Sequence, residues 1–110
     1  MDITIKLEAK LAMGNADTYG TSLVGYMPAG TYYNDLVHVF GEPQAAPPGN
    51  GKIKVEWSGH INGLVFTIYD YKSHMIPKDN IDWHIGGKKK LVANLVIAYF
   101  KEAMKQVAAQ

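Results

Sequence analysis

Residues 84–90, HIGGKKK, combine residue types that bind a compact anion. We predict a helix from residue 88, and the first N–H groups of a helix lack intrahelical partners. Gly86 and Gly87 would let a phosphate approach those N–H groups without a Cβ in the way, and Lys88 would add positive charge. His84 could donate a hydrogen bond to the anion or to a neighbouring carbonyl. The alternative interpretation is a glycine turn followed by lysines that face solvent.

Tyrosine is frequent, because the chain holds seven tyrosines and two tryptophans but three phenylalanines. Aromatic rings that carry a polar group suit a hydrated pocket in which a nucleobase stacks. Along residues 64–72 the alternation of side chains places Tyr69 and Tyr71 on the face opposite the core. Tyr71, near the end of this strand, is therefore a candidate for contact with a ligand.

A second pattern indicates an enzyme instead. Glu56 lies on one predicted strand and Asp70-x-Lys72 on the next, as in the acidic residue and D-x-K arrangement of metal-dependent nucleases. In such sites two carboxylates hold a divalent cation and the lysine contacts the scissile phosphate. The pattern is short, and a D-x-K at a strand end often faces solvent. We therefore favour binding without catalysis and predict no catalytic residue.

The four histidines do not indicate a metal site. His38, His60, His74 and His84 lack the H-x-x-x-H spacing, and the chain has no cysteine. We expect His38 on the exposed side of its helix and His60 in a turn. We predict neither a bound metal nor another cofactor.

Charge is local rather than global. The net charge is +1, which does not favour a broad contact with duplex DNA. Lys88, Lys89 and Lys90 lie together, and Lys101 and Lys105 follow on the same predicted helix. This distribution suits a small nucleotide better than sequence-specific binding to a nucleic acid.

Composition indicates a globular protein, with 47% hydrophobic and 19% charged residues in 110. This length predicts a single domain over residues 1–110. The lack of cysteine fits a reducing compartment, and the N-terminus lacks the pattern of a signal peptide. No stretch approaches the roughly 20 apolar residues of a membrane span. We therefore expect a cytoplasmic protein that does not enter a membrane.

The order of elements predicts an α+β fold with a small antiparallel sheet of four to five strands and two helices, the C-terminal one long. Helical spacing predicts a helix that Thr31 caps and Gly41 ends, and a second helix over 88–107. Trp57 and Trp83 share faces with aliphatic residues and are predicted core. The predicted strands are 3–7, 21–27, 52–57, 63–72 and 81–85, and the predicted connections include 44–51, 58–62 and 73–80.

The predicted C-terminal helix is apolar around most of its circumference, which exceeds one core-facing stripe. A domain of this size has little other protein to cover a second apolar face. We therefore expect a homo-oligomer that associates through the 88–107 helix. The apolar positions are Leu91, Val92, Leu95, Val96, Ile97, Ala98, Tyr99 and Phe100.

Five blocks in order resemble a widespread family of small bacteriophage proteins, over about residues 18 to 90. The chain is most similar to phage anti-defence proteins of the Thoeris and CBASS counter-defence kind. The resemblance implies an oligomer that sequesters a cyclic nucleotide or cyclic ADP-ribose signal without cleaving it, in pockets at subunit interfaces. The blocks are GTSLVGY at 20–26, FGEP at 40–43, KVEW at 54–57, TIYDYK at 67–72 and WHIGG at 83–87.

The predicted mechanism is capture without chemistry. Phosphates would lie on the N–H groups of Gly86 and Gly87, with lysines and hydroxyls as further donors, and bases would stack on tyrosine. All eleven basic residues are lysine, so bidentate guanidinium contacts are absent. The predicted ligand-binding residues are Thr21, Ser22, Tyr26, Tyr71, Lys72, His84, Gly86, Gly87, Lys88 and Lys90.

Two alternatives from other classes stay open. A protein-directed inhibitor, such as an anti-CRISPR, would bind a host protein through an exposed face and need no small ligand. A metal-dependent nuclease or phosphodiesterase would turn its ligand over and depend on Glu56 and Asp70.

Overall fold

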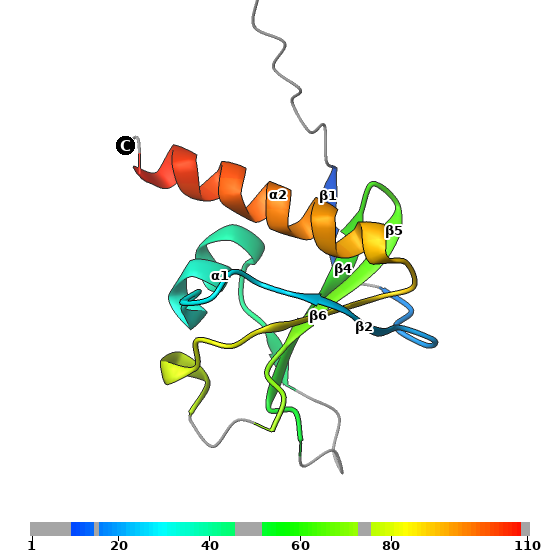
Figure 1. The fold of residues 1–110 in the computed structure, drawn as a ribbon, viewed down its shortest axis with the longest axis horizontal. Helices are drawn as coiled ribbons and strands as arrows, with labels where there is room; N and C mark the ends of the chain where they lie inside the picture. Colours follow the sequence, from blue (N-terminus) through cyan, green and yellow to red (C-terminus); the bar gives the residue numbers. More distant parts are fainter. Residues whose placement is uncertain (1–9, 15, 46–51, 73–75, 109–110) are drawn as a thin grey trace, which may run out of the picture.

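The computed structural model describes residues 10–14, 16–45, 52–72 and 76–108. It confirms the predicted α+β class: an antiparallel sheet with two α-helices, of which the C-terminal one is long (Figure 1). The elements are β1 (Leu11–Met13), β2 (Ser22–Tyr26), α1 (Tyr33–Phe40), β3 (Gln44–Ala45), β4 (Val55–Ile61), β5 (Leu64–Tyr69), the 3₁₀ helix η1 (Pro77–Asp79), β6 (His84–Gly87) and α2 (Lys90–Ala108).

Five strands lie side by side in the order β1-β4-β5-β6-β2, and the short β3 also pairs with β4. The β4–β5 hairpin turns at Asn62 and Gly63, which have positive φ angles of 51° and 77°. Asn-Gly is the preferred pair for a two-residue hairpin turn that needs such angles. The connection predicted at 58–62 is therefore wrong, since β4 continues to Ile61 and His60 lies within it.

Both helices cover the same face of the sheet. Phe40 of α1 packs on Phe66 of β5, with ring centroids 5.8 Å apart, and α2 contacts β2, β4, β5 and β6. Trp57 and Trp83 are buried and meet edge to face with centroids 5.3 Å apart, which confirms both as core. The sheet residues that this layer buries are Trp57, Ile61, Phe66, Ile68 and Ile85.

Glycines in two neighbouring strands let α2 approach the sheet closely. A Cβ on Gly25 would lie 2.7 Å from Cβ of Ala93, and a Cβ on Gly87 would lie 3.0 Å from Cβ of Val92. Real Cβ atoms do not approach other heavy atoms at 2.7 Å, because repulsion rises steeply inside contact distance. The first two turns of α2 therefore rest on backbone rather than on side chains of β2 and β6.

Helix α1 begins one residue later than predicted. The N–H of Tyr32 donates to Oδ2 of Asp35 at 3.0 Å, whereas the Thr31 hydroxyl donates to a backbone carbonyl. Gly41, with φ of 85°, ends the helix as predicted. The indole N–H of Trp57 donates to the Gly41 carbonyl at 2.7 Å, which fixes the end of α1 against β4.

Other boundaries also differ from the prediction. Strand β6 covers 84–87 rather than 81–85, and α2 begins at Lys90 rather than at residue 88. The predicted loop at 44–51 contributes the two residues of β3. The strand predicted at 3–7 lies outside the described residues.

Helix α2 buries one side and leaves a second side partly exposed. Val92, Val96 and Phe100 are buried against the sheet and α1, whereas Leu91 is 53% exposed. Across the described residues, no helix is long and apolar enough to cross a membrane. Association of copies of the chain through this partly exposed side of α2 stays a prediction.

We expect Gly25→Ala to lower the free energy of unfolding by about 1–3 kcal/mol, because the new methyl would overlap Ala93. Urea unfolding of Gly25→Ala, Ala93→Gly and the double variant measures the coupling between the two sites. Ala93→Gly alone loses helix propensity, so the test is the coupling energy and not the single change. Strict additivity of the two single changes would contradict the close contact.

Candidate functional site

A row of polar side chains crosses the face of the sheet that the helices do not cover. The pairing places Gln44 opposite Glu56, Glu56 opposite Tyr69, Tyr69 opposite His84 and His84 opposite Tyr26. Directly opposed residues of neighbouring strands share a face, so all five side chains lie on one side. Four strand spacings make this polar row about 19 Å long. Every member is at least partly exposed.

His84 lies at the centre of an aromatic cluster formed with Tyr26, Tyr69 and Tyr71. The His84 ring centroid lies 4.9 Å from that of Tyr26, edge to face, and 5.4 Å from those of Tyr69 and Tyr71. Tyr26 and Tyr71 are 58% and 39% exposed, so their rings remain free to stack with another ring. Nζ of Lys72 lies 5.5 Å from the Tyr71 ring centroid, within cation–π range.

Partial burial shifts the pKa of three neighbours in the polar row. Burial lowers the pKa of His84, and the nearby charges of Asp82 and Asp70 partly offset this lowering. Burial raises the pKa of Glu56. The pKa of Tyr69 is raised by burial and then by Glu56 and the two other tyrosines. Each of these pKa shifts is in the direction that disfavours the charged form, because partial burial makes a charge costly.

Gly86 and Gly87 do not open the last helix, so the backbone placement that predicted a phosphate cradle is wrong. Both are buried in β6 and pair with β5 on one side and β2 on the other. A Cβ on Gly86 would overlap Oγ1 of Thr67 and lie 3.4 Å from the Tyr69 ring, while Gly87 accommodates Val92. The pair therefore serves packing on both faces of the sheet, and contact of either glycine with a ligand stays a prediction.

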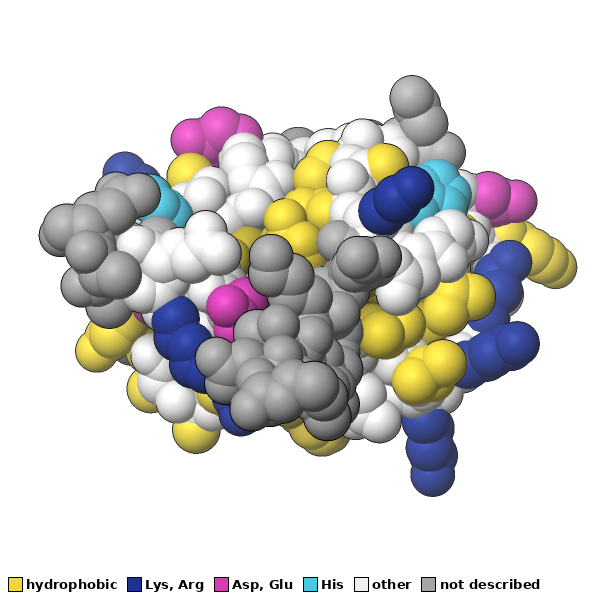
Figure 2. Space-filling model, turned by 90° about the horizontal axis from the view of Figure 1, so that it is seen from above, with side chains coloured by type: hydrophobic (Ala, Val, Ile, Leu, Met, Phe, Trp, Pro, Cys, Tyr) yellow, Lys and Arg dark blue, Asp and Glu magenta, His cyan; other side chains and the backbone are white. Residues whose placement is uncertain are grey.

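The predicted lysines lie at a separate end of the sheet. Lys88, Lys89 and Lys90 are exposed, and Gly20 of the β1–β2 loop lies beside Lys88. Figure 2 shows lysine side chains gathered at the right-hand end, where α2 begins. This basic end, with Thr21 and Ser22 beside it, begins past Gly87, the residue of β6 that lies three positions, or about 10 Å, from His84. The ten predicted site residues thus form two groups rather than one pocket.

The residues of the nuclease pattern do not converge on a metal site. Glu56 shares the face of Tyr69, whereas Oδ1 of Asp70 accepts hydrogen bonds from the backbone N–H groups of Lys54 and Val55 at 2.9 and 3.1 Å. Asp70 is fully buried and joins the open ends of β4 and β5. In the described part of the chain no three His, Asp or Glu side chains lie together as metal ligands would.

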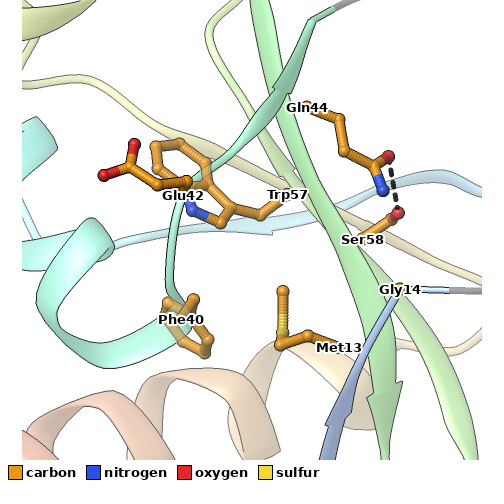
Figure 3. A pocket seen from close by; sticks show the side chains of 7 residues that line it. All are labelled: Met13, Gly14, Phe40, Glu42, Gln44, Trp57 and Ser58. Atoms are coloured by element: carbon orange, nitrogen blue, oxygen red, sulfur yellow. Dashed lines mark hydrogen bonds between the residues drawn. The ribbon is translucent and has the colours of Figure 1, made fainter.

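A hollow of about 220 Å³ lies on the outer edge of β4, between the ends of β1 and β3. Phe40, Trp57 and Met13 form its apolar side, and Gln44 and Ser58 its polar side, with 3.4 Å between Oε1 and Oγ (Figure 3). The carboxylate of Glu42 points away from that pair (Figure 3). This hollow contains none of the predicted site residues and is too small for a nucleotide.

Sequence reasoning missed three members of the polar row as candidates for ligand contact: Gln44, which lies in a predicted loop, Glu56 and Tyr69. Tyr69 shares its face with Tyr71, which the two-residue period along the strand already indicated. Glu56 was weighed only as a metal ligand, because its cross-strand partner depends on the register of the hairpin. An Asn-Gly turn at 62–63 was the signal that could have fixed this register.

Comparison of the chain with protein-family models, with curated proteins and with solved structures finds no match.

The lowered pKa of His84 predicts a pH dependence of stability. The His84 imidazole takes up a proton more readily in the unfolded chain, where its pKa is near the ordinary 6.5, than in the folded chain. The neutral ring's contribution to the free energy of unfolding is therefore complete above that pH and is lost as the pH falls below it. Because the ring is partly exposed, the loss should stay below about 1 kcal/mol. Urea unfolding between pH 7.5 and 5 should show a shallower dependence of stability on pH for His84→Gln than for the parent. Equal slopes in parent and His84→Gln would contradict the shift.

Proposed function

We propose that this chain is a phage anti-defence protein that binds a cyclic nucleotide or cyclic ADP-ribose immune signal in the host cytoplasm and sequesters it without cleaving it. The observation that carries the proposal is the aromatic cluster around His84, on the sheet face that the helices leave uncovered. Three tyrosine rings with hydroxyl groups beside a lysine provide stacking, hydrogen bonding and one positive charge. These are the contacts that a nucleotide needs.

In this proposal the base lies on Tyr26 or Tyr71, and Lys72 contacts a phosphate near it. Lys72 has a positive φ of 52° and its N–H donates to the Lys52 carbonyl, so its backbone position is fixed. Lys88 and Lys90, with Thr21 and Ser22, form a second region for phosphate beyond the Gly87 end of β6, which itself lies about 10 Å from His84. An extended ligand that reaches both regions would use both groups of predicted residues.

Sequestration without cleavage is supported by the positions of Glu56 and Asp70. Glu56 lies on the face of Tyr69, whereas Asp70 is buried and accepts hydrogen bonds from the backbone, so these two carboxylates do not face one scissile phosphate. We further propose that copies of this chain form a homo-oligomer through the partly exposed side of α2, where Leu91 is 53% exposed. Association would cover apolar surface that the monomer leaves in water.

The first experiment is a panel of cyclic di- and trinucleotides and cyclic ADP-ribose isomers, read by thermal shift, heat release and mass determination of the ligand. We expect one member to bind and return intact, and we expect Tyr71→Ala to weaken its Kd about tenfold, since one base stack contributes roughly 1–3 kcal/mol. Tyr19→Ala, at an 87% exposed tyrosine outside the cluster, is the matched control and should bind like the parent.

Other outcomes assign other functions. A ligand that returns cleaved would identify an enzyme and overturn sequestration. No shift with any member would favour a protein-directed inhibitor, because exposed tyrosines such as Tyr26 and Tyr71 are also enriched in protein interfaces.

The basic end makes a separate prediction. Lys88→Ala with Lys90→Ala should weaken binding of the identified ligand and flatten its dependence on salt, because two positive charges near phosphate are removed. Lys101→Ala with Lys105→Ala removes the same charge from exposed positions further along α2 and should leave both properties unchanged. Equal effects of the two double variants would reject a phosphate contact at the start of α2.

A further inference from the structure

Glu56 stands beside the aromatic cluster as a hydrogen-bond acceptor. It lies directly opposite Tyr69 on the neighbouring strand and on the same face. Opposed residues in antiparallel strands have Cβ atoms about 4.5–5.5 Å apart. Tyr69 in turn lies between Glu56 and His84 in the polar row. A base stacked on Tyr71, two residues beyond Tyr69, rather than on Tyr26 three strands away, would therefore present an edge to the Glu56 carboxylate.

The Glu56 carboxylate is half-buried and has unused acceptor capacity. Within the described ranges no hydrogen bond or ion pair reaches it. An ionised carboxylate accepts hydrogen bonds through both oxygens and donates none. Its partial burial makes the charged form costly, as the raised pKa shows, and this cost falls when N–H donors approach. The position is thus adapted to a ligand edge that carries donors only.

We propose that Glu56 selects a guanine base, whose adjacent N1–H and N2–H groups match the two oxygens of one carboxylate. This inference rests on the proposed function and names the base of the ligand. Guanine is the only common base with two adjacent donors on one edge. Adenine and cytosine place a ring acceptor beside their amino group, and uracil has carbonyls on both sides of its N–H. Each of those bases would direct a lone pair at the carboxylate, so guanine gains a contact that the others lose.

The test uses GMP, IMP and AMP as probes of the full chain, with Kd from chemical-shift titration. IMP retains N1–H but lacks the 2-amino group, so it measures the second donor without any change in the protein. We expect GMP to bind at least about tenfold more tightly than AMP, with IMP between them. In Glu56→Gln the ratio of GMP to AMP affinity should fall to about one. Glu102→Gln, at an exposed position of α2, should keep the parent ratio.

The outcomes separate this inference from the proposed function. Binding of all three probes with equal affinity, or a GMP preference that survives Glu56→Gln, overturns guanine selection and leaves nucleotide binding in place. Equal affinity for GMP and IMP overturns the two-donor contact by a measurement that needs no folded variant. If no probe binds and the cyclic panel also fails, the proposed function fails and the inference falls with it.

Discussion

The close contact between α2 and the backbone of β2 and β6 is the constraint on which the rest of the structure depends. Gly25 and Gly87 have no side chain to separate the helix from the sheet, so Ala93 and Val92 rest directly on the strands. Phe100, further along α2, stacks on Phe40 of α1, whose ring also packs on β5. The described residues form two α-helices, and both pack on one face of the sheet.

Strand alternation then determines what the other face carries. Each strand that buries an aliphatic or aromatic residue against the helices must direct its next residue to the opposite side. In β6 this alternation buries Ile85 and presents His84, and in β5 it buries Ile68 and presents Tyr69. The polar row is therefore a consequence of the same register that builds the core. A slip of one residue in the β4–β5 hairpin would exchange the two sets, which makes Asn62–Gly63 important for the site as well as for the fold.

Local patterns predicted the elements well where one physical signal dominated. The Tyr33–Phe40 helix follows from apolar spacing and from Gly41 at its end, and the burial of Trp57 and Trp83 follows from alternation. The structural role of Gly86–Gly87 was harder to predict, because glycines before lysines fit both the start of a helix and a strand that is packed on both faces. The decisive facts are that Gly86 lies against Thr67 and Gly87 against Val92. Thr67 is distant in the sequence and the position of Val92 depends on how α2 packs, so the local pattern indicates neither contact. The same limit applied to Glu56, whose neighbour Tyr69 is set by pairing and not by spacing.

The separation of charge from the aromatic cluster bears on how a ligand would be discriminated. Lysines at the start of α2 attract any anion, and their effect falls with salt over a Debye length of about 8–10 Å. Three adjacent side chains of the polar row, by contrast, have pKa values that partial burial shifts in the direction of the uncharged form. Recognition at such a surface depends on stacking and on the direction of hydrogen bonds, which salt screens little. In the proposed function, charge at one end would set the rate and strength of ligand capture, while the polar row would set which base is captured.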